Sequence, residues 1–223
     1  MAKTTQYSAV HLIPEANVDP GLWNTFPDPA AINRTVKEIE KRGITVVRAR
    51  DGSYALESLK KIIPTDAEVM SGSSTTLIEI GFEEFISGRD CTWKNIHTRI
   101  FAENDEVKRA ELRRKSVTSD YYVSGVNAIA QTGEMVGCDA SGSRVGAWAF
   151  AAGHLVLVAG VNKIVPTLSD ALDRVRNYVY PLENVRALKV YGVPSAIAKI
   201  VILEQERTPG RITLVMIDET LGY

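Results

Sequence analysis

Two continuous apolar runs constrain the fold of this chain more than any other feature of its sequence. Residues Tyr121–Val126 and His154–Val161 are apolar without the alternation of a half-exposed strand, and they are too short to cross a membrane. A strand that is apolar on both faces has to be covered on both sides, as parallel strands of α/β proteins are. The sequence therefore predicts an α/β fold with a mostly parallel sheet and helices on both faces.

Segments with helical spacing separate the predicted strands. Asp28-Pro29 supplies an N-cap and a proline at the first helical position, and Gly43 ends that helix. Further helices are expected at Leu56–Ile63, Leu77–Phe85, 103–116, Ser141–Ala152 and Leu168–Val179, and further strands at Ile44–Val47, Glu68–Ser71, Lys199–Leu203 and Ile212–Ile217. The last two strands are expected to be joined through Thr208-Pro209-Gly210.

Two of these helices carry clear end signals. Thr167 and Asp170 have the spacing of a capping box before Leu168. In residues 103–116 the acidic side chains come first and the basic ones later, which complements the helix dipole. We therefore interpret this charge run as a solvated helix face.

The chain is expected to consist of an N-terminal arm, residues 1–27, and one α/β domain, residues 28–223. The arm is rich in Asn and Pro and has scattered aromatic residues, among them Trp23 and Phe26, without periodicity. We expect it to pack over the domain or over a neighbouring subunit without a regular core of its own. The chain is therefore predicted to form a homo-oligomer.

Composition excludes several classes of protein. The formal net charge of −1 gives no overall attraction to nucleic acid or to acidic membranes, so neither is an expected partner. Cys91 and Cys138 have no ligand-like spacing, which argues against a disulfide framework, a metal site and a cysteine-bound iron–sulfur centre. Unpaired thiols and an N-terminus without the apolar core of a signal peptide predict a cytoplasmic protein.

Three segments follow predicted strands and are rich in residues that bind ligands, and in open α/β sheets ligands bind at the carboxyl ends of strands. The first is Ser71–Thr76, whose candidate ligand-binding residues are Gly72, Ser73, Ser74 and Thr75. Its spacing is neither that of a P-loop nor that of a dinucleotide fingerprint, and a polar turn that caps a helix is the alternative. Glu79, about one turn later, either faces the same cleft or is an exposed helix carboxylate.

The second segment runs from Ser124 to Arg144. Its candidate ligand-binding residues are Gly125, Asn127, Thr132, Gly142 and Arg144, and Asp139 is a candidate catalytic acid or base. Arg144 in the first turn of a helix is unfavourable to the helix dipole unless it meets an anion or Asp139. A purely structural Asp139–Arg144 pair is therefore the alternative.

The third segment is Gly160–Val165. Lys163 follows a continuous apolar strand, so its ammonium group is expected at the carboxyl edge of the sheet, where it could hold a phosphate or a carboxylate. Asn162 is a candidate ligand-binding residue beside it, and a lysine that merely reaches solvent is the alternative. We predict that the three segments meet in one pocket.

The histidines and the common motifs indicate no particular chemistry. His11 lies in the arm, His97 has no evident triad partners, and His154 begins a strand. The sequence holds no G-x-S-x-G and no H-E-x-x-H, and no paired carboxylates that spacing alone identifies. The identity of a cofactor stays unknown, and no metal ligand set is predicted.

Taken together, the segments resemble the LUD-domain family, which includes the third component of bacterial lactate-utilisation operons. The matching text is SGSSTTLIEIG at Ser71–Gly81, SDYYVSGVNAIAQTGEMVGCDASGSRVG at Ser119–Gly146, VAGVNKIV at Val158–Val165, PLENVR at Pro181–Arg186 and RITLVMIDETLGY at Arg211–Tyr223. The resemblance runs from about residue 30 to the end. It implies a fold similar to ribose-5-phosphate isomerase, glucosamine-phosphate deaminase and the CoA transferases, in which the loop matching Gly72–Thr76 contacts phosphate or an acyl thioester.

The resemblance implies a small anionic ligand and leaves three functions open. The first is a non-redox subunit that supports the oxidation of L-lactate to pyruvate alongside iron–sulfur partner proteins. The second is a stand-alone enzyme of isomerase, transferase or hydrolase type on a phosphorylated or carboxylated small molecule. In that enzyme Glu79, Asp139 and Lys163 are the candidate catalytic residues, with Glu79 or Asp139 as the acid or base, and Lys163 and Arg144 would hold the anion. The third is a structural module that binds a partner.

Overall fold

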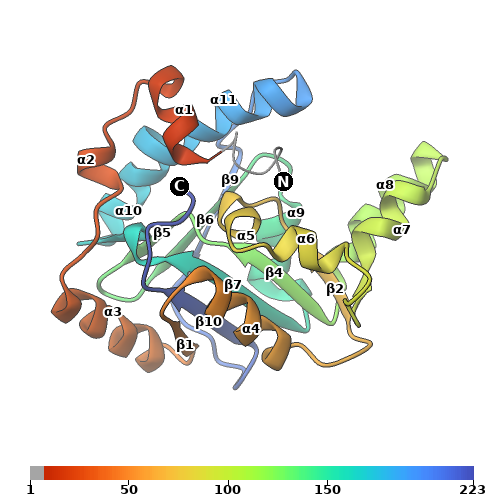
Figure 1. Ribbon diagram of the computed structural model, residues 1–223, viewed down its shortest axis with the longest axis horizontal. Coiled ribbons are helices and arrows are strands. Elements are labelled where there is room, and N and C mark those ends of the chain that lie inside the picture. Colours follow the sequence, from red (N-terminus) through yellow and green to blue (C-terminus); the bar gives the residue numbers. More distant parts are fainter. Residues whose placement is uncertain (1–7) are drawn as a thin grey trace.

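A six-stranded parallel sheet forms the centre of the molecule, and the computed structural model of the chain describes residues 8–223. In spatial order the strands are β1 (Thr45–Ala49), β10 (Ile212–Ile217), β7 (His154–Gly160), β4 (Tyr121–Gly125), β2 (Glu68–Ser71) and β3 (Lys94–Asn95). The two apolar runs are β4 and β7, which pair with each other near the middle of the sheet (Figure 1). The predicted α/β class is confirmed.

Helices cover both faces of this sheet, which explains why the central strands are apolar throughout. One face is covered by α3 (Pro29–Lys41) and the other by α4 (Gly52–Ile62), α5 (Thr75–Glu79) and α6 (Phe82–Ile86). The further helices are α7 (Ile96–Ala102), α8 (Glu106–Lys115), α9 (Ser143–Gly146), α10 (Leu168–Arg174) and α11 (Tyr180–Tyr191). Along β7, Leu155 and Leu157 belong to a core with α3, whereas Val156 and Val158 belong to a core with α4 to α6. None of the helices within residues 8–223 is long and apolar enough to cross a bilayer.

A second, mixed sheet was not predicted. Its order is β8 (Ile164–Val165), β5 (Ala128–Ala130), β6 (Met135–Asp139) and β9 (Lys199–Leu203), and β6 runs antiparallel to both of its neighbours. The prediction treated residues 127–142 as a loop because two very short strands flank a polar turn there. The two last strands of the chain do follow one another, but β9 lies in this sheet and β10 in the larger one.

The described part of the arm is helical, which the sequence did not predict. Helix α1 (Ala9–Ala16) packs on α11, and Leu12 is buried with Tyr178 and Leu182, while α2 (Pro20–Trp23) follows at once. Both helices are short, and Pro14 interrupts α1, so neither shows an apolar period. The arm therefore packs over the domain as far as residues 8–27 show, whereas residues 1–7 lie outside the described residues. The division at residue 27 and the homo-oligomer stay predictions.

Two predicted helices have different ends. The helix expected over Leu77–Phe85 is split into α5 and α6 at Gly81, whose φ of 79° is in the left-handed region that favours glycine. The helix expected to end at Val179 continues through a π-helical turn, Val175–Val179, into α11. Pro181 lies just after that turn in the continuous helix, where the change in hydrogen-bond spacing accommodates a residue without a backbone N–H.

Candidate functional site

A cleft of about 1120 Å³ opens at the carboxyl ends of β2, β4 and β7. Residues from all three predicted segments line it: Gly72, Ser73, Ser74 and Thr75 after β2, Gly125, Asn127, Asp139 and Arg144 between β4 and α9, and Lys163 after β7. The sheet brings them together because parallel strands end at the same edge. The predicted meeting of the three segments in one pocket is therefore observed, while their role in binding stays a prediction.

The part of the cleft beside Lys163 is called its inner end below. Two glycines let the loops there pack so closely that no side chain would fit at their positions. A Cβ atom on Gly72 would lie 2.8 Å from Cδ of Arg144, and one on Gly125 would collide with the hydroxyl of Ser74. Ser74 in turn caps α5 by accepting a hydrogen bond from the backbone N–H of Leu77 at 3.4 Å. The loop after β2 and the end of β4 therefore interlock, and they fix the shape of the inner end.

Lys163 lies at the bottom of the cleft and is 1% exposed. Its Nζ donates a hydrogen bond to Oγ1 of Thr76 at 2.6 Å, and no carboxylate of the described residues forms an ion pair with it. Burial, together with the nearby Arg174 guanidinium, lowers the pKa of Lys163 to about 7, although Glu79 opposes the shift. The amine therefore titrates near neutral pH.

Glu79 and Asn162 do not line the cleft; they hold the C-terminal segment against it. Oε2 of Glu79 accepts a hydrogen bond from the backbone N–H of Gly222 at 2.6 Å, and Oδ1 of Asn162 accepts one from Leu221 at 3.2 Å. Burial raises the pKa of Glu79, while the Gly222 N–H and Lys163 oppose the rise. These contacts place Tyr223 in the cleft wall. The partners of Glu79 and Asn162 lie far away in the sequence, so the local sequence does not indicate them.

Arg144 and Asp139 both line the cleft, but they do not form a side-chain ion pair. Asp139 instead accepts the backbone N–H of Arg144 at 2.8 Å. The guanidinium donates to the carbonyl of Gly125 at 3.0 Å, to Oδ1 of Asn127 at 2.9 Å and to the carbonyl of Cys138. Arg144 thus ties β4 to β6 and adds positive charge to the wall.

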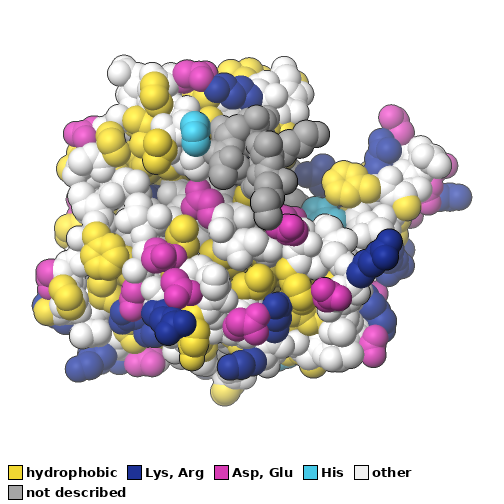
Figure 2. Space-filling model, in the orientation of Figure 1, with side chains coloured by type: hydrophobic (Ala, Val, Ile, Leu, Met, Phe, Trp, Pro, Cys, Tyr) yellow, Lys and Arg dark blue, Asp and Glu magenta, His cyan; other side chains and the backbone are white. Residues whose placement is uncertain are grey.

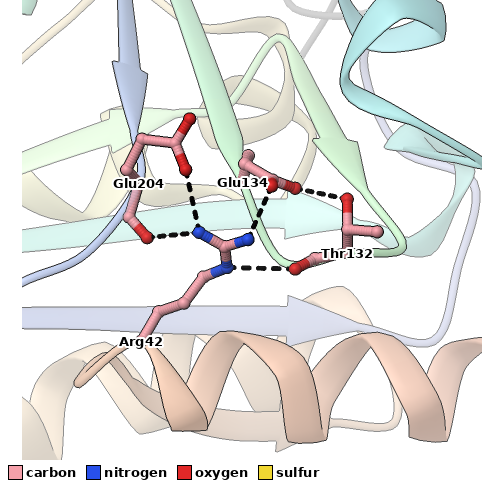
Figure 3. A network of polar contacts seen from close by, with 4 residues as sticks. All are labelled: Arg42, Thr132, Glu134 and Glu204. Carbon is pink, nitrogen blue, oxygen red and sulfur yellow. Dashed lines mark hydrogen bonds and ion pairs between the residues drawn. The ribbon is translucent and has the colours of Figure 1, made fainter.

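Two predicted ligand-binding residues lie apart from the cleft lining. Gly142 packs against Lys199, whose Cδ would be 2.5 Å from a Cβ at that position. Thr132 belongs to the turn between β5 and β6, where its carbonyl accepts from Nε of Arg42 at 3.0 Å (Figure 3). Neither is among the residues that line the cleft. The sequence predicts one polar loop that contains both residues. In the structure Thr132 lies in the turn before β6 and Gly142 lies after β6, so the strand separates them.

The contacts of Arg42 fasten α3 to the second sheet. Besides Thr132, its guanidinium binds the carboxylate of Glu134 at 2.5 Å and both the carbonyl and the carboxylate of Glu204, at 2.6 and 3.0 Å (Figure 3). Only 23% of the Arg42 side chain and 12% of the Glu134 side chain are exposed, so water screens this pair less than a surface pair.

We expect Arg42→Ala to lower the free energy of unfolding by about 1–3 kcal/mol, because the buried carboxylate of Glu134 and two carbonyls lose their donor. Lys41→Ala is the matched control, since the Lys41 side chain is 69% exposed and pairs only with Glu38. It should change the stability by less than about 0.5 kcal/mol. Urea denaturation measures both changes in stability. Equal effects of the two variants would show that the Arg42 network stabilises the fold no more than an exposed ion pair does.

Sequence reasoning missed the side walls of the cleft. One wall comes from α7 and α8 and includes His97, Phe101, Arg109 and Arg113. The charge run of α8 was interpreted only as a solvated face, and α8 has no buried residue, yet Arg109 and Arg113, four residues apart, turn one side of it to the cleft. That spacing was the available signal, but the direction of the helix depends on the tertiary fold.

The opposite wall comes from α11 and the C-terminus. Arg186 binds both carboxylate oxygens of Glu183 at 2.7 Å, and the hydroxyl of Tyr223 donates to Glu183 at 2.7 Å. This wall is therefore nearly neutral. Among residues 8–223, no group of three or more His, Cys, Asp and Glu side chains is placed to hold a metal ion.

Comparisons with known proteins found one matching protein family and similar solved structures. A family model described as LUD domain matches residues 32–217. No curated protein matches the chain. Among solved structures, the crystal structure of a DUF162 family protein from Deinococcus radiodurans is similar at 11% sequence identity, with a TM-score of 0.47, and the alignment covers 84% of this chain and 96% of that one.

Proposed function

Because this chain belongs to the LUD-domain family, we propose that it binds a small anionic molecule in the cleft and supports lactate utilisation as a non-redox subunit. The resemblance inferred from the sequence is confirmed by the family match. At the family level, membership connects the chain to lactate utilisation. The ligand, its site and the role of a subunit are our proposal.

The observation that carries the proposal is the buried Lys163 at the point where the three strand-end loops meet. An amine without a carboxylate partner is costly to bury in its charged form. An anionic ligand at the inner end would supply the missing countercharge. The hydroxyls of Ser73 and Ser74 and the positive charge of Arg144 line the same cleft and would favour the same guest.

We assign electron transfer to iron–sulfur partner proteins. The chain has two cysteines, and iron–sulfur clusters are commonly held by four cysteine thiolates. In this arrangement the subunit holds the lactate or pyruvate carboxylate, or another small acid, while the partners carry the electrons.

One observation also favours the alternative, an isomerase, transferase or hydrolase acting on a phosphorylated or carboxylated molecule. Lys163 has a pKa near neutrality, which suits proton transfer, and Asp139 lines the same cleft. An enzyme that moves protons on its substrate would exchange substrate hydrogen with D₂O. NMR of lactate, pyruvate and ribose 5-phosphate in D₂O tests this directly.

We expect isothermal titration calorimetry to detect binding of lactate, pyruvate or inorganic phosphate to the wild type, and Ser73→Trp to weaken it at least tenfold. Ser73 is exposed and lines the cleft, so an indole there fills the inner end without disturbing the core. Ser87→Trp, at an exposed position that does not line the cleft, is the matched control. Equal affinities of the two variants, or no binding of any anion by the wild type, would refute the proposed site.

A further inference from the structure

The cleft is far larger than the small acid of the proposed function requires. Pockets for drug-sized ligands measure about 300–1,000 Å³, and this cleft measures about 1120 Å³. A three-carbon acid beside Lys163 would leave most of that space open. The remaining space, called the outer half of the cleft below, lies between α7–α8 and the end of α11. Residues of these helices line the same cleft.

The α7–α8 wall offers positive charge without full compensation. Helices α7 and α8 extend away from the main body (Figure 1), and Figure 2 shows basic, acidic and hydrophobic side chains together on this pair. Arg113 is exposed and forms no ion pair with a described carboxylate, while Arg109 approaches Glu106 only at 3.7 Å. Two guanidinium groups on one side of a helix are suited to a phosphate chain.

The same wall presents an aromatic ring that is exposed but held in place. Phe101 is 78% exposed, and its ring stacks on that of His97 with 5.7 Å between centroids and an angle of 14°. Nε2 of His97 lies 2.8 Å from the carbonyl of Ser71, which fixes the supporting ring. Across the cleft, Tyr191 and Val193 are each 58% exposed. The outer half therefore combines apolar surfaces with the charge of Arg113, unpaired among the described residues, and with Arg109, which is paired only at 3.7 Å with Glu106 of the same lining.

We propose that the outer half of the cleft binds a nucleotide, whose base stacks on Phe101 and whose phosphates contact Arg109 and Arg113. A purely apolar guest would leave the two arginines unused, and a simple polyanion would leave the Phe101 ring unused. A nucleotide matches both features, because aromatic stacking holds the base and guanidinium groups hold phosphate. The inner end beside Lys163 stays free for the small acid, so this inference extends the proposed function and rests on it for that second ligand.

Titration of the full chain with ADP, adenosine and inorganic pyrophosphate tests each half of the proposal. We expect ADP to bind more tightly than adenosine or pyrophosphate. Phe101→Ala should weaken ADP and adenosine about tenfold or more and leave pyrophosphate unchanged. The double variant Arg109→Ala with Arg113→Ala should weaken ADP and pyrophosphate and leave adenosine unchanged.

Matched controls separate these effects from general losses of charge or apolar surface. Phe150 is 88% exposed and lies outside the cleft lining, so Phe150→Ala should leave ADP binding unchanged. Arg114→Ala removes an exposed charge from α8 on a side that does not line the cleft, and it too should have no effect. All of these side chains are at least partly exposed, so the variants are expected to fold.

The outcomes distinguish this inference from the proposed function. Binding of phosphate or lactate without binding of ADP overturns the nucleotide site and leaves the small-anion site standing. Binding of ADP that neither Phe101→Ala nor the double arginine variant weakens overturns the inference as well. Binding of ADP that responds to these variants, in a protein that binds no small acid, supports the nucleotide site and refutes the small-acid site.

Discussion

Replacing Lys163 with Met is expected to raise the free energy of unfolding while it removes the affinity for small anions. The side chain is 1% exposed, and its pKa falls from 10.5 to about 7. Each pKa unit corresponds to about 1.4 kcal/mol, so holding the charged amine in the folded protein costs on the order of 5 kcal/mol. A methionine of similar length avoids that cost but leaves the hydroxyl of Thr76 without the amine. We therefore expect a net gain of about 1–4 kcal/mol.

The gain should depend on pH in a defined direction. The folded pKa of Lys163 lies below the unfolded one, so between about pH 7 and 10.5 the unfolded chain binds more protons. The wild type therefore becomes more stable as the pH rises through this window. Below pH 7 the amine is protonated in both states, and the advantage of Lys163→Met is largest. Above pH 10 the advantage should have nearly vanished.

Urea denaturation of wild type and Lys163→Met at pH 6 and pH 9 measures this difference. Lys61→Met, which removes an exposed charge from α4, is the control and should shift stability equally at both pH values. A Lys163→Met protein that is less stable than wild type at pH 6 would mean that the buried amine is compensated within the fold. In the wild type, anion affinity should decline as the pH rises above about 7, because the ammonium form is lost.

The second effect is expected for Arg174→Met, which should lower the free energy of unfolding by about 1–3 kcal/mol, because two backbone carbonyls lose their donor. Arg174 is fully buried; its Nε donates to the carbonyl of Trp23 at 3.0 Å and its Nη1 to the carbonyl of Asn127. Methionine leaves both part-buried carbonyls without this donor. Since Trp23 lies in α2 and Asn127 follows β4, this one residue ties the arm to the cleft.

Arg174→Met should also move the titration of the cleft. The guanidinium lowers the pKa of Lys163, so its removal should raise that pKa and shift the pH at which anion affinity declines upward. Arg176→Met, exposed two residues later, is the control for both readouts. An unchanged pH midpoint in a folded Arg174→Met protein would show that Arg174 acts on stability alone.

The sequence was most informative where local chemistry decides structure. Asp28 accepts the N–H of Ala31 at 2.9 Å as the predicted cap, and Thr167 and Asp170 form the predicted capping box. The apolar runs indicated β4 and β7, and through them the edge where Lys163 lies. The second sheet was missed because β5 and β8 are only three and two residues long, and because β8 and β9 join the β5–β6 hairpin from distant parts of the chain.

In the candidate site, too, the features set by local sequence were predicted and those set by the tertiary fold were not. Strand ends are readable from the sequence, so the segments around Ser73, Asn127 and Lys163 were predicted to meet. Partners supplied by distant segments were not readable: the carboxylate of Glu79 accepts from the N–H of Gly222, and the backbone carbonyl of Thr132 accepts from Arg42. The wall that carries Phe101 and Arg113 depends on the direction in which α7 and α8 leave the body, which no local pattern specifies.

The loops around Gly72 and Gly125 tolerate substitutions poorly, whereas the surface of α8 tolerates them well. A single methyl group at Gly72 or Gly125 would meet Arg144 or Ser74, whereas α8 buries none of its side chains. Substitutions there alter what the entrance recognises and leave the folded state nearly undisturbed. Divergence among related chains should therefore concentrate on α8, and a new specificity would be engineered most readily by changing the side chains of that helix alone.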